Sequence, residues 1–435
     1  MRDFFIIVIF SVWAIYALKR PYYGALLWVW IGLMNPHRLG WGFAYSLPFA
    51  MIAAMMTMLS IIINPKDFKW PQGLPVVILI LFTLWMGITT NSAIHPDPSL
   101  NKYIDVLKVL LMTMVVGSVV RTREDIFSLI WIIILSIGYF GFKGGIFTII
   151  TGGSFRVWGP PSSLVEGNNE LAVALTMIIP LMYFMVKNTH IVAKLFFFKK
   201  FPLNWIKMGI YLVIFLCAVS VIGSHSRGAF LAIIGMLSML WWRSGAKFSV
   251  GFLLILVAPL VIFLMPDEWM NRMNTIETYE EDASAMGRIN AWKMAINIAN
   301  DRFLGAGFST ASRAVYEMYA PNPNDVLVAH SIYFQVLGEH GYIGLVLYLL
   351  FWLSTYIIAG QLVHLAKGNG NLEWAGLLGS MCKVSLVGFA IGGAFLSLAY
   401  WDMPYYIMII LVCTEHLVKE QLAMHQSNQT TSDEC

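Results

Sequence analysis

The sequence predicts an all-α polytopic membrane protein, with about 12 transmembrane helices and a helical subdomain in its largest outer loop. Apolar residues make up 58% of the 435 residues, charged residues make up 12%, and the mean hydropathy is +0.71. A soluble domain carries about 25% charged residues, so this chain has too few of them to cover a surface facing water. The apolar residues also gather in repeated runs, long enough to cross a hydrocarbon core roughly 30 Å thick.

The charge and the cysteines exclude several classes of function. The net charge is +4, which is too small and too dispersed to indicate a nucleic-acid partner. Of the four cysteines, Cys217, Cys382 and Cys413 lie inside apolar runs and Cys435 is the last residue. The sequence therefore has neither a disulfide framework nor the cysteine spacing of a zinc site.

The individual spans follow from the apolar runs, read with a window of about 20 residues. At the start of the chain, residues 4–18 and 22–35 are shorter runs split by Lys-Arg-Pro, which predict two spans, or one span with a re-entrant partner. The first run has the length of a signal peptide, but no small-residue cleavage site follows it, so we keep it in the mature chain. The other expected spans are residues 44–63, 74–92, 104–120, 125–150, 170–187, 205–223, 226–242, 247–265, 343–363, 374–398 and 404–420.

Lysine and arginine collect in alternate connections, which sets the expected orientation because short cytoplasmic loops hold the positive excess. The basic connections carry Lys66, Lys69, Arg121, Arg123, Lys194, Lys199, Lys200, Lys207, Arg243, Lys247 and Lys367. The loops expected on the opposite side are 88–101, 151–169, 224–227, 266–342 and 399–403. In a bacterium that side is the periplasm, so we expect a multi-pass protein of the inner membrane.

The expected organisation has five segments. They are N-terminal transmembrane helices (1–150), central transmembrane helices with outer turns that carry arginine (151–265), a large outer loop with a histidine-containing helix (266–342), C-terminal transmembrane helices (343–420), and a polar tail expected to be disordered in the cytoplasm (421–435).

The large outer loop is the candidate subdomain. Asp282 or Ser284 could cap a helix that runs through residues 288–296 and rests its apolar face on the membrane surface. Gly305 would end this helix, and a second helix would begin near His330.

Arg227 is informative because a charge beside the membrane is costly. It lies in Ser-His-Ser-Arg-Gly, at a tight outer turn between two apolar runs. A guanidinium matches phosphate oxygens with a planar fork of donors, and the start of the following helix adds unpaired N–H groups. The commoner role for such an arginine is to anchor a helix to lipid headgroups.

Arg288 and Arg156 lie in two other outer segments, each a few residues from a tryptophan. Together with Arg227 they could converge on one diphosphate, or they could be separate contacts with lipid headgroups. Spacing in the sequence leaves both arrangements open.

His330 is the candidate general base, because an imidazole with an ordinary pKa near 6.5 can accept a proton at neutral pH. A lone histidine is more often structural, and we interpret His225 and His340 as structural. Glu339 could orient a ring, although it shares no obvious helical face with His330. Asp402 could pair with an arginine or contact a sugar, but a role in its turn is commoner. The outer loops lack paired metal-binding motifs, so we expect no cofactor and no catalytic metal.

Three matches carry a family resemblance. His330 and Ser331 are followed after nine residues by Gly341 and then Gly344. Arg227 stands four residues before Leu231. The outer loop has Gly-Arg, then Trp, then Leu-Gly-x-Gly, at Gly287, Arg288, Trp292, Leu304, Gly305 and Gly307. This ordered set resembles the O-antigen ligase family over residues 150–400, and the first 120 residues look like those of ligases found beside exosortase-type sorting systems.

The resemblance implies a GT-C-type glycosyltransferase that moves a glycan from undecaprenyl diphosphate to lipid A-core, with inversion and without a metal. His330 would then take the proton of the acceptor hydroxyl, while Arg156, Arg227 and Arg288 stabilise the diphosphate, with Glu339 and Asp402 in support. An O-antigen polymerase or a protein O-oligosaccharyltransferase would use similar motifs. A lipid-linked glycan flippase or transporter is the alternative from another class, and it would place charges near the bilayer midplane.

Overall fold

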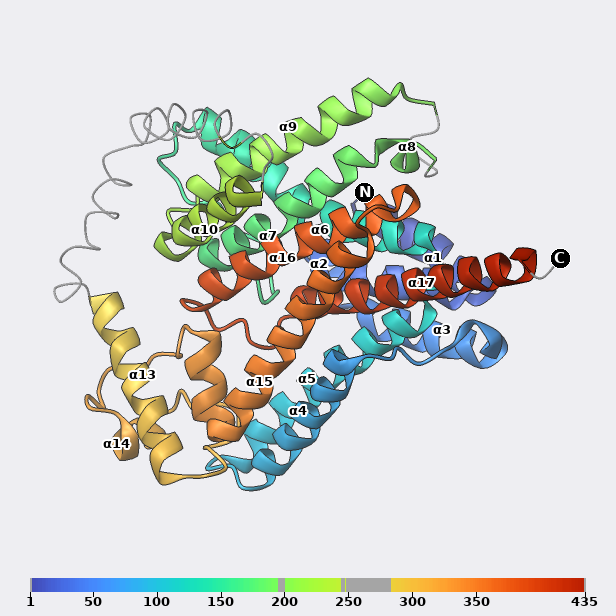
Figure 1. Ribbon diagram of the computed structural model, residues 1–435. Coiled ribbons are helices and arrows are strands. Elements are labelled where there is room, and N and C mark those ends of the chain that lie inside the picture. Colours follow the sequence, from blue (N-terminus) through green and yellow to red (C-terminus); the bar gives the residue numbers. More distant parts are fainter. Residues whose placement is uncertain (1, 195–199, 244–246, 248–282, 434–435) are drawn as a thin grey trace.

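The computed structural model describes residues 2–194, 200–243, 247 and 283–433, and in these ranges it contains helices and turns but no strand. This confirms the prediction of an all-helical fold. Long helices form the body of the molecule, and α13 and α14 lie at one end, beside the start of α15 (Figure 1). The α-helices are α1 (Arg2–Lys19), α2 (Pro21–Met34), α3 (Phe49–Ile63), α4 (Leu74–Asn91), α5 (Pro96–Val119), α6 (Arg123–Ile150), α7 (Asn168–Lys187), α8 (Thr189–Val192), α9 (Leu203–Ile222), α10 (Arg227–Arg243), α13 (Ala283–Asp301), α14 (Arg313–Tyr319), α15 (Ile332–Leu365), α16 (Glu373–Gly393) and α17 (Asp402–Asp433). Short 3-10 helices are η1 (Pro36–Leu39), η2 (Phe43–Ser46), η3 (Pro65–Asp67) and η4 (Gly370–Leu372).

Within the described ranges, six helical stretches are long and apolar enough to cross a membrane: α4, α6, α7, α9, α15, and Gly370–Gly393, which contains α16. Helices α2 and α3 are apolar but shorter. The chain is therefore a helical membrane protein with several spans, and the count of about 12 stays a prediction. The expected span 247–265, apart from residue 247, and the expected boundary after residue 265 lie outside the described residues, as do Asp282 and Lys199.

Helices α6, α7 and α9 pack closely because glycines on α6 let neighbouring helices approach. A side chain at Gly145 would collide with the backbone of Leu216 on α9, and one at Gly141 would collide with Cys217 of α9 and Leu175 of α7. Small residues of this kind are typical of helix contacts in membranes, where close van der Waals packing replaces the hydrophobic effect. This packing sets the position of the end of α9, and so of the turn that carries Arg227.

Helix α7 is the most buried of the six, because 83% of its most apolar 18-residue stretch lies inside the protein. It also contacts α16, where Ser385 donates a hydrogen bond of 2.7 Å from Oγ to the carbonyl of Met177. Because α7, α9 and α16 are held together in this way, the segments that follow α9 and α16 meet beside the start of α7.

The C-terminal segment differs from its prediction. We expected disorder from residue 421, but α17 continues to Asp433. Good helix formers such as Leu422 and Met424 follow the apolar part of α17, and Lys419 pairs with Glu415 at 2.7 Å, one helical turn apart. Local helix propensity and pairs of this kind explain the continuation.

Helix α13 confirms the helix expected in the outer loop, and one apolar face of this helix packs against α14. Ala291, Met294 and Ile298 form a buried cluster with Val315 and Tyr316 of α14. This face therefore packs against α14, and the contact expected between the face of Ile289 and Ile296 and the membrane surface stays a prediction. The packing gives the outer segment a core of its own.

Asp125 joins the first two helices to α6. Its carboxylate accepts hydrogen bonds from Arg20 at 2.7 Å and from the backbone N–H of Arg121 and Thr122 at 3.0 Å each. The Tyr22 hydroxyl donates to the Asp125 carbonyl at 2.6 Å. The side chain is 4% exposed, so these bonds are shielded from water.

We therefore expect Asp125→Ala to cost about 1–3 kcal/mol of stability, because it leaves buried donors without an acceptor. Thermal unfolding of the detergent-solubilised protein measures this loss. Asp105→Ala is the matched control, since Asp105 pairs with Lys108 at 3.1 Å on an exposed surface and such pairs contribute little. Equal shifts in the two variants would contradict the anchoring role of Asp125.

Candidate active site

Arg227 and Arg288 line the same narrow cleft, which has a volume of about 10 Å³. It lies where four segments meet: the start of α7, the start of α10, helix α13, and the connection between α16 and α17. The other lining residues are Asn169, Ser226, Gly228, Phe395 and Leu396. The structure thus brings together two of the three arginines that the sequence singled out, from segments far apart along the chain.

The turn before Arg227 is held by buried hydrogen bonds. His225 Nε2 lies 2.7 Å from the carbonyl of Gly153, in the loop between α6 and α7. Asn168, the first residue of α7, donates to the carbonyl of Ser224 at 2.7 Å. Ser226 accepts a hydrogen bond of 3.2 Å from the backbone N–H of Ala229, which caps α10. His225 therefore has a structural part in fixing the position from which Arg227 extends.

Gly228 lets the start of α10 approach the connection between α16 and α17. A Cβ atom at Gly228 would lie 3.0 Å from Cβ of Phe395. Glu170, in the first turn of α7, is within electrostatic range of Arg288. Among the described residues, the cleft thus holds two guanidinium groups, and the carboxylate of Glu170 lies near one of them.

His330 lies beside this cleft, two residues before α15 begins at Ile332. Its backbone N–H donates to Ser397 Oγ at 3.0 Å, which ties it to the connection that contributes Phe395. Burial lowers the pKa of the imidazole below its ordinary value of 6.5, and the nearby charge of Arg288 lowers this pKa further. Its Nδ1 atom is buried and has no hydrogen-bond partner among the described residues.

The backbone of His330 has a left-handed conformation, with φ of +42°. This conformation is uncommon for residues other than glycine, and it persists only where neighbouring contacts hold it. Trp292 supplies one such contact, because its Nε1 donates to the carbonyl of Ala329 at 2.7 Å. The same indole stacks on Phe334, with ring centroids 5.0 Å apart. Trp292 follows Arg288 by one helical turn. One face of α13 therefore contributes Arg288 to the cleft and Trp292 to the contacts that hold the segment of His330.

The Leu-Gly-x-Gly element packs on α15 through its backbone. Ala306 and Gly307 donate hydrogen bonds to the carbonyls of Gly338 and Glu339, at 3.0 and 2.9 Å. At Gly341, α15 has a kink with φ of +66°, and a side chain there would collide with the carbonyl of Phe303. The glycines of the signature are thus explained by close backbone contact and a positive φ.

Glu339 is engaged away from His330. Its carboxylate accepts a hydrogen bond of 2.5 Å from the hydroxyl of Tyr400, which also lies 2.9 Å from Nε2 of His340. His340 Nδ1 lies 2.7 Å from the hydroxyl of Thr89 on α4. All four residues of this network, Glu339, Tyr400, His340 and Thr89, are buried. Sequence reasoning missed Tyr400 and Thr89, because nothing in their local pattern indicates a buried polar network.

Arg156 and Asp402 do not line the cleft. Arg156 is exposed in the loop between α6 and α7, which contacts the turn of Arg227 through Gly153 and His225. Asp402 starts α17 and lies against Gly32 of α2. Their expected contributions to diphosphate binding and to support stay predictions.

In the part of the chain that the structure describes, no three His, Cys, Asp or Glu residues lie close enough to hold a metal ion. Metal independence stays a prediction that needs an experiment.

Comparison with known proteins gives the family. Residues 212–349 match the O-antigen ligase family. This match contains Arg227 and Arg288, which line the cleft, His330 beside it, and Gly341 at the kink of α15. This region of the chain belongs to the O-antigen ligase family. Residues 1–190, which form α1 to α7, match a family of unknown function (DUF5935), and this match extends past the expected N-terminal boundary at residue 150. No curated protein matches the chain.

Proposed function

We propose that this protein is an O-antigen ligase, an inverting and metal-independent glycosyltransferase of the bacterial inner membrane. It transfers a glycan from undecaprenyl diphosphate to lipid A-core on the periplasmic face, during lipopolysaccharide biosynthesis. Family membership supports an enzyme of the O-antigen ligase and polymerase superfamily. The observation that carries the finer proposal is the cleft that Arg227 and Arg288 share, with His330 at its side.

The two guanidinium groups suit a diphosphate leaving group. Negative charge develops on the diphosphate as the anomeric C–O bond breaks, and fixed positive groups stabilise this charge most where water is excluded. Arg227 is the first residue of α10, so the positive end of the helix dipole also lies at the cleft. In this proposal Arg227 and Arg288 bind the diphosphate, and Arg156 approaches it from the neighbouring loop when the donor binds.

His330 suits the acceptor side. A neutral imidazole can take the proton from the attacking sugar hydroxyl, and the low pKa of His330 keeps it neutral across the ordinary pH range. The lower pKa also makes His330 a weaker base. A reaction with a leaving group as good as diphosphate needs less help from a base. Donor and acceptor are both lipid-anchored, and their confinement to one membrane interface lowers the entropic cost of their encounter.

The most direct test of the proposed reaction is reconstitution. Purified protein, undecaprenyl-diphosphate glycan and lipid A-core are combined in liposomes, and the joined product is measured. A product on lipid A-core supports the ligase. A longer lipid-linked glycan would identify a polymerase, and movement of the donor across the bilayer without a new bond would identify a flippase.

Arg227→Ala should reduce transfer at least 10²-fold while membrane insertion is retained, because one main stabiliser of the leaving group is lost. Arg227→Lys should recover little, since a point charge lacks the bidentate fork. The readout is initial rate in the reconstituted assay. Arg313→Ala is the control, because Arg313 lies on α14 and is 76% exposed in a surface pair with Glu317. Full activity in Arg227→Ala would leave Arg227 as a headgroup anchor.

Transfer should persist in excess EDTA, because positive side chains take the place of a metal in this proposal. The measurement is the rate of the detergent-solubilised enzyme before and after chelation. A requirement for added Mg²⁺ or Mn²⁺ that chelation reverses would show that carboxylate ligands exist and that the arginines do not act alone.

The activity of the wild-type enzyme should hold as the pH falls to 6.5 and decline only at lower pH. The reason is that the lowered pKa of His330 keeps the imidazole able to accept a proton below its ordinary titration range. His330→Gln should lose roughly 10²-fold in rate and also lose this acidic decline.

The control for this experiment is His190→Gln, since His190 is exposed on α8, away from the cleft. It should keep both the rate and the pH profile of the wild-type enzyme. Near-normal turnover of His330→Gln would remove His330 as the base, and Glu339 and Asp402 would be tested next.

A further inference from the structure

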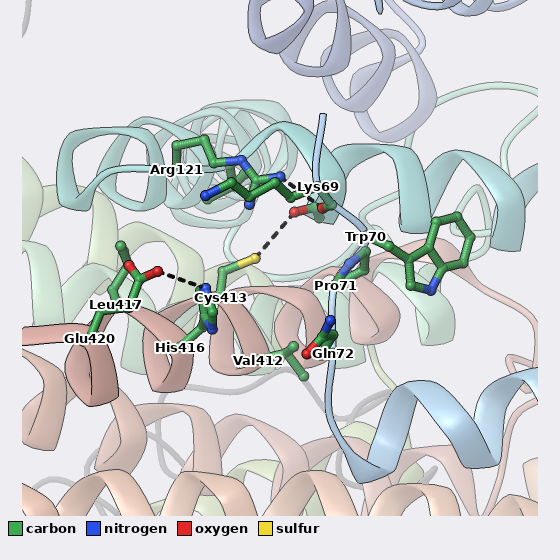
Figure 2. Close-up of a pocket in the computed structure, with 12 residues that line it drawn as sticks. Lys69, Trp70, Pro71, Gln72, Arg121, Val412, Cys413, His416, Leu417 and Glu420 are labelled. Carbon is green, nitrogen blue, oxygen red and sulfur yellow. Dashed lines mark hydrogen bonds and ion pairs between the residues drawn. The ribbon is translucent and has the colours of Figure 1, made fainter. Parts of the chain in front are cut away.

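A second pocket lies at the opposite end of the long helices from the cleft. It is formed by the segment before α4, the end of α5 and one face of α17 (Figure 2). Just before α5, Ile94 bonds to Ala306 of the outer segment, and α5 then runs 24 residues to Val119. At 1.5 Å per residue this helix is about 36 Å long. The pocket is therefore separate from the candidate active site, and the inference below does not rest on the proposed function.

Arg121 is fixed at the edge of this pocket by backbone carbonyls. Its Nη2 donates to the carbonyl of Lys69 at 2.7 Å and also to that of Ser118, and its Nε donates to the carbonyl of Asp67 at 3.4 Å. No acidic side chain forms an ion pair with Arg121 among the described residues. The guanidinium is thus held in place by backbone carbonyls, while the carboxylates of Glu420, Asp125 and Asp67 lie within electrostatic range without an ion pair.

The remaining charged groups surround the pocket opening. Figure 2 shows Lys69 near Arg121 on one side, with His416 and Glu420 of α17 on the other. The Glu420 carboxylate lies 3.1 Å from His416 Nε2, so it already has a partner. Among the residues that line the pocket, two cations, Lys69 and Arg121, therefore face one carboxylate, which favours an anionic ligand there.

The inner wall of the pocket is apolar. Pro71, Val120, Val412 and Leu417 contribute to it, and the pocket volume is about 260 Å³. Trp70 is 45% exposed at the rim, as is common for tryptophan at a membrane interface. A pocket with a cationic rim and an apolar wall at the end of membrane helices matches a phosphate ester that carries an apolar group.

We propose that this pocket binds the phosphate group of an anionic phospholipid, with the phosphate between Lys69 and Arg121. The basic connections at this end are those that the positive-inside rule assigns to the cytoplasm, where anionic headgroups attract them. The alternative is that Arg121 only fastens the segment before α4 to α5. In that case Lys69 and Glu420 would have no effect on ligand binding.

The test uses the full-length protein in a neutral detergent, titrated with dihexanoyl phosphatidylglycerol and followed by native mass spectrometry. Lys69→Gln should weaken binding roughly threefold or more, which is the range of one partly exposed charge contact. Glu420→Gln should strengthen it, because the repelling carboxylate is removed. Lys66→Gln is the matched control, since Lys66 is exposed three residues earlier in the same segment and does not line the pocket.

Competition with inorganic phosphate distinguishes a bound phospholipid from a bound soluble phosphate compound. If inorganic phosphate does not displace the lipid at millimolar concentration, the bound group belongs to a phospholipid, as proposed. If it displaces the lipid and its own binding depends on Lys69, the site is confirmed for phosphate and the natural ligand is soluble. Equal lipid binding by the wild type, Lys69→Gln and Glu420→Gln would overturn the proposal.

Discussion

Two backbone hydrogen bonds, from Ala306 and Gly307 to the carbonyls of Gly338 and Glu339, join the outer segment to α15. They need a close approach of two backbones, which Gly305 and Gly341 permit because neither has a side chain and both have positive φ. Together with the contacts of Trp292 to Ala329 and Phe334, this contact holds α13 beside the start of α15. Arg288 and His330, which these two elements position, depend on these contacts for their position relative to one another.

The remaining part of the cleft depends on contacts inside the membrane. Glycines on α6 allow α9 to pack closely, and the end of α9 positions the turn before Arg227. The connection that carries Phe395 is tied to the outer segment through Ser397, which accepts a hydrogen bond from His330. The cleft is therefore assembled where spans and outer segment meet, which suits chemistry between two substrates whose lipid anchors stay in the bilayer.

Sequence patterns predicted the helical class and many of the helices, because long apolar runs leave few other structures in a membrane. They also singled out Arg227, Arg288 and His330, since a charge or a histidine at an outer helix end stands out against an apolar background. They could not show that Arg227 and Arg288 converge while Arg156 stays outside the cleft, because this depends on packing between distant segments. The bond between Tyr400 and Glu339, and the helix that continues past residue 421, had no signal in apolar periodicity either.

Whether Arg227 and Arg288 act on one bound diphosphate is tested by a double-mutant cycle on donor binding. The affinity for undecaprenyl-diphosphate glycan is measured for the wild type, Arg227→Gln, Arg288→Gln and the double variant. Residues that share a partner show a coupling free energy of about 0.5–3 kcal/mol, and we expect a value in this range. Losses that add to within about 0.3 kcal/mol would mean that the two arginines contact separate groups, and would contradict the account.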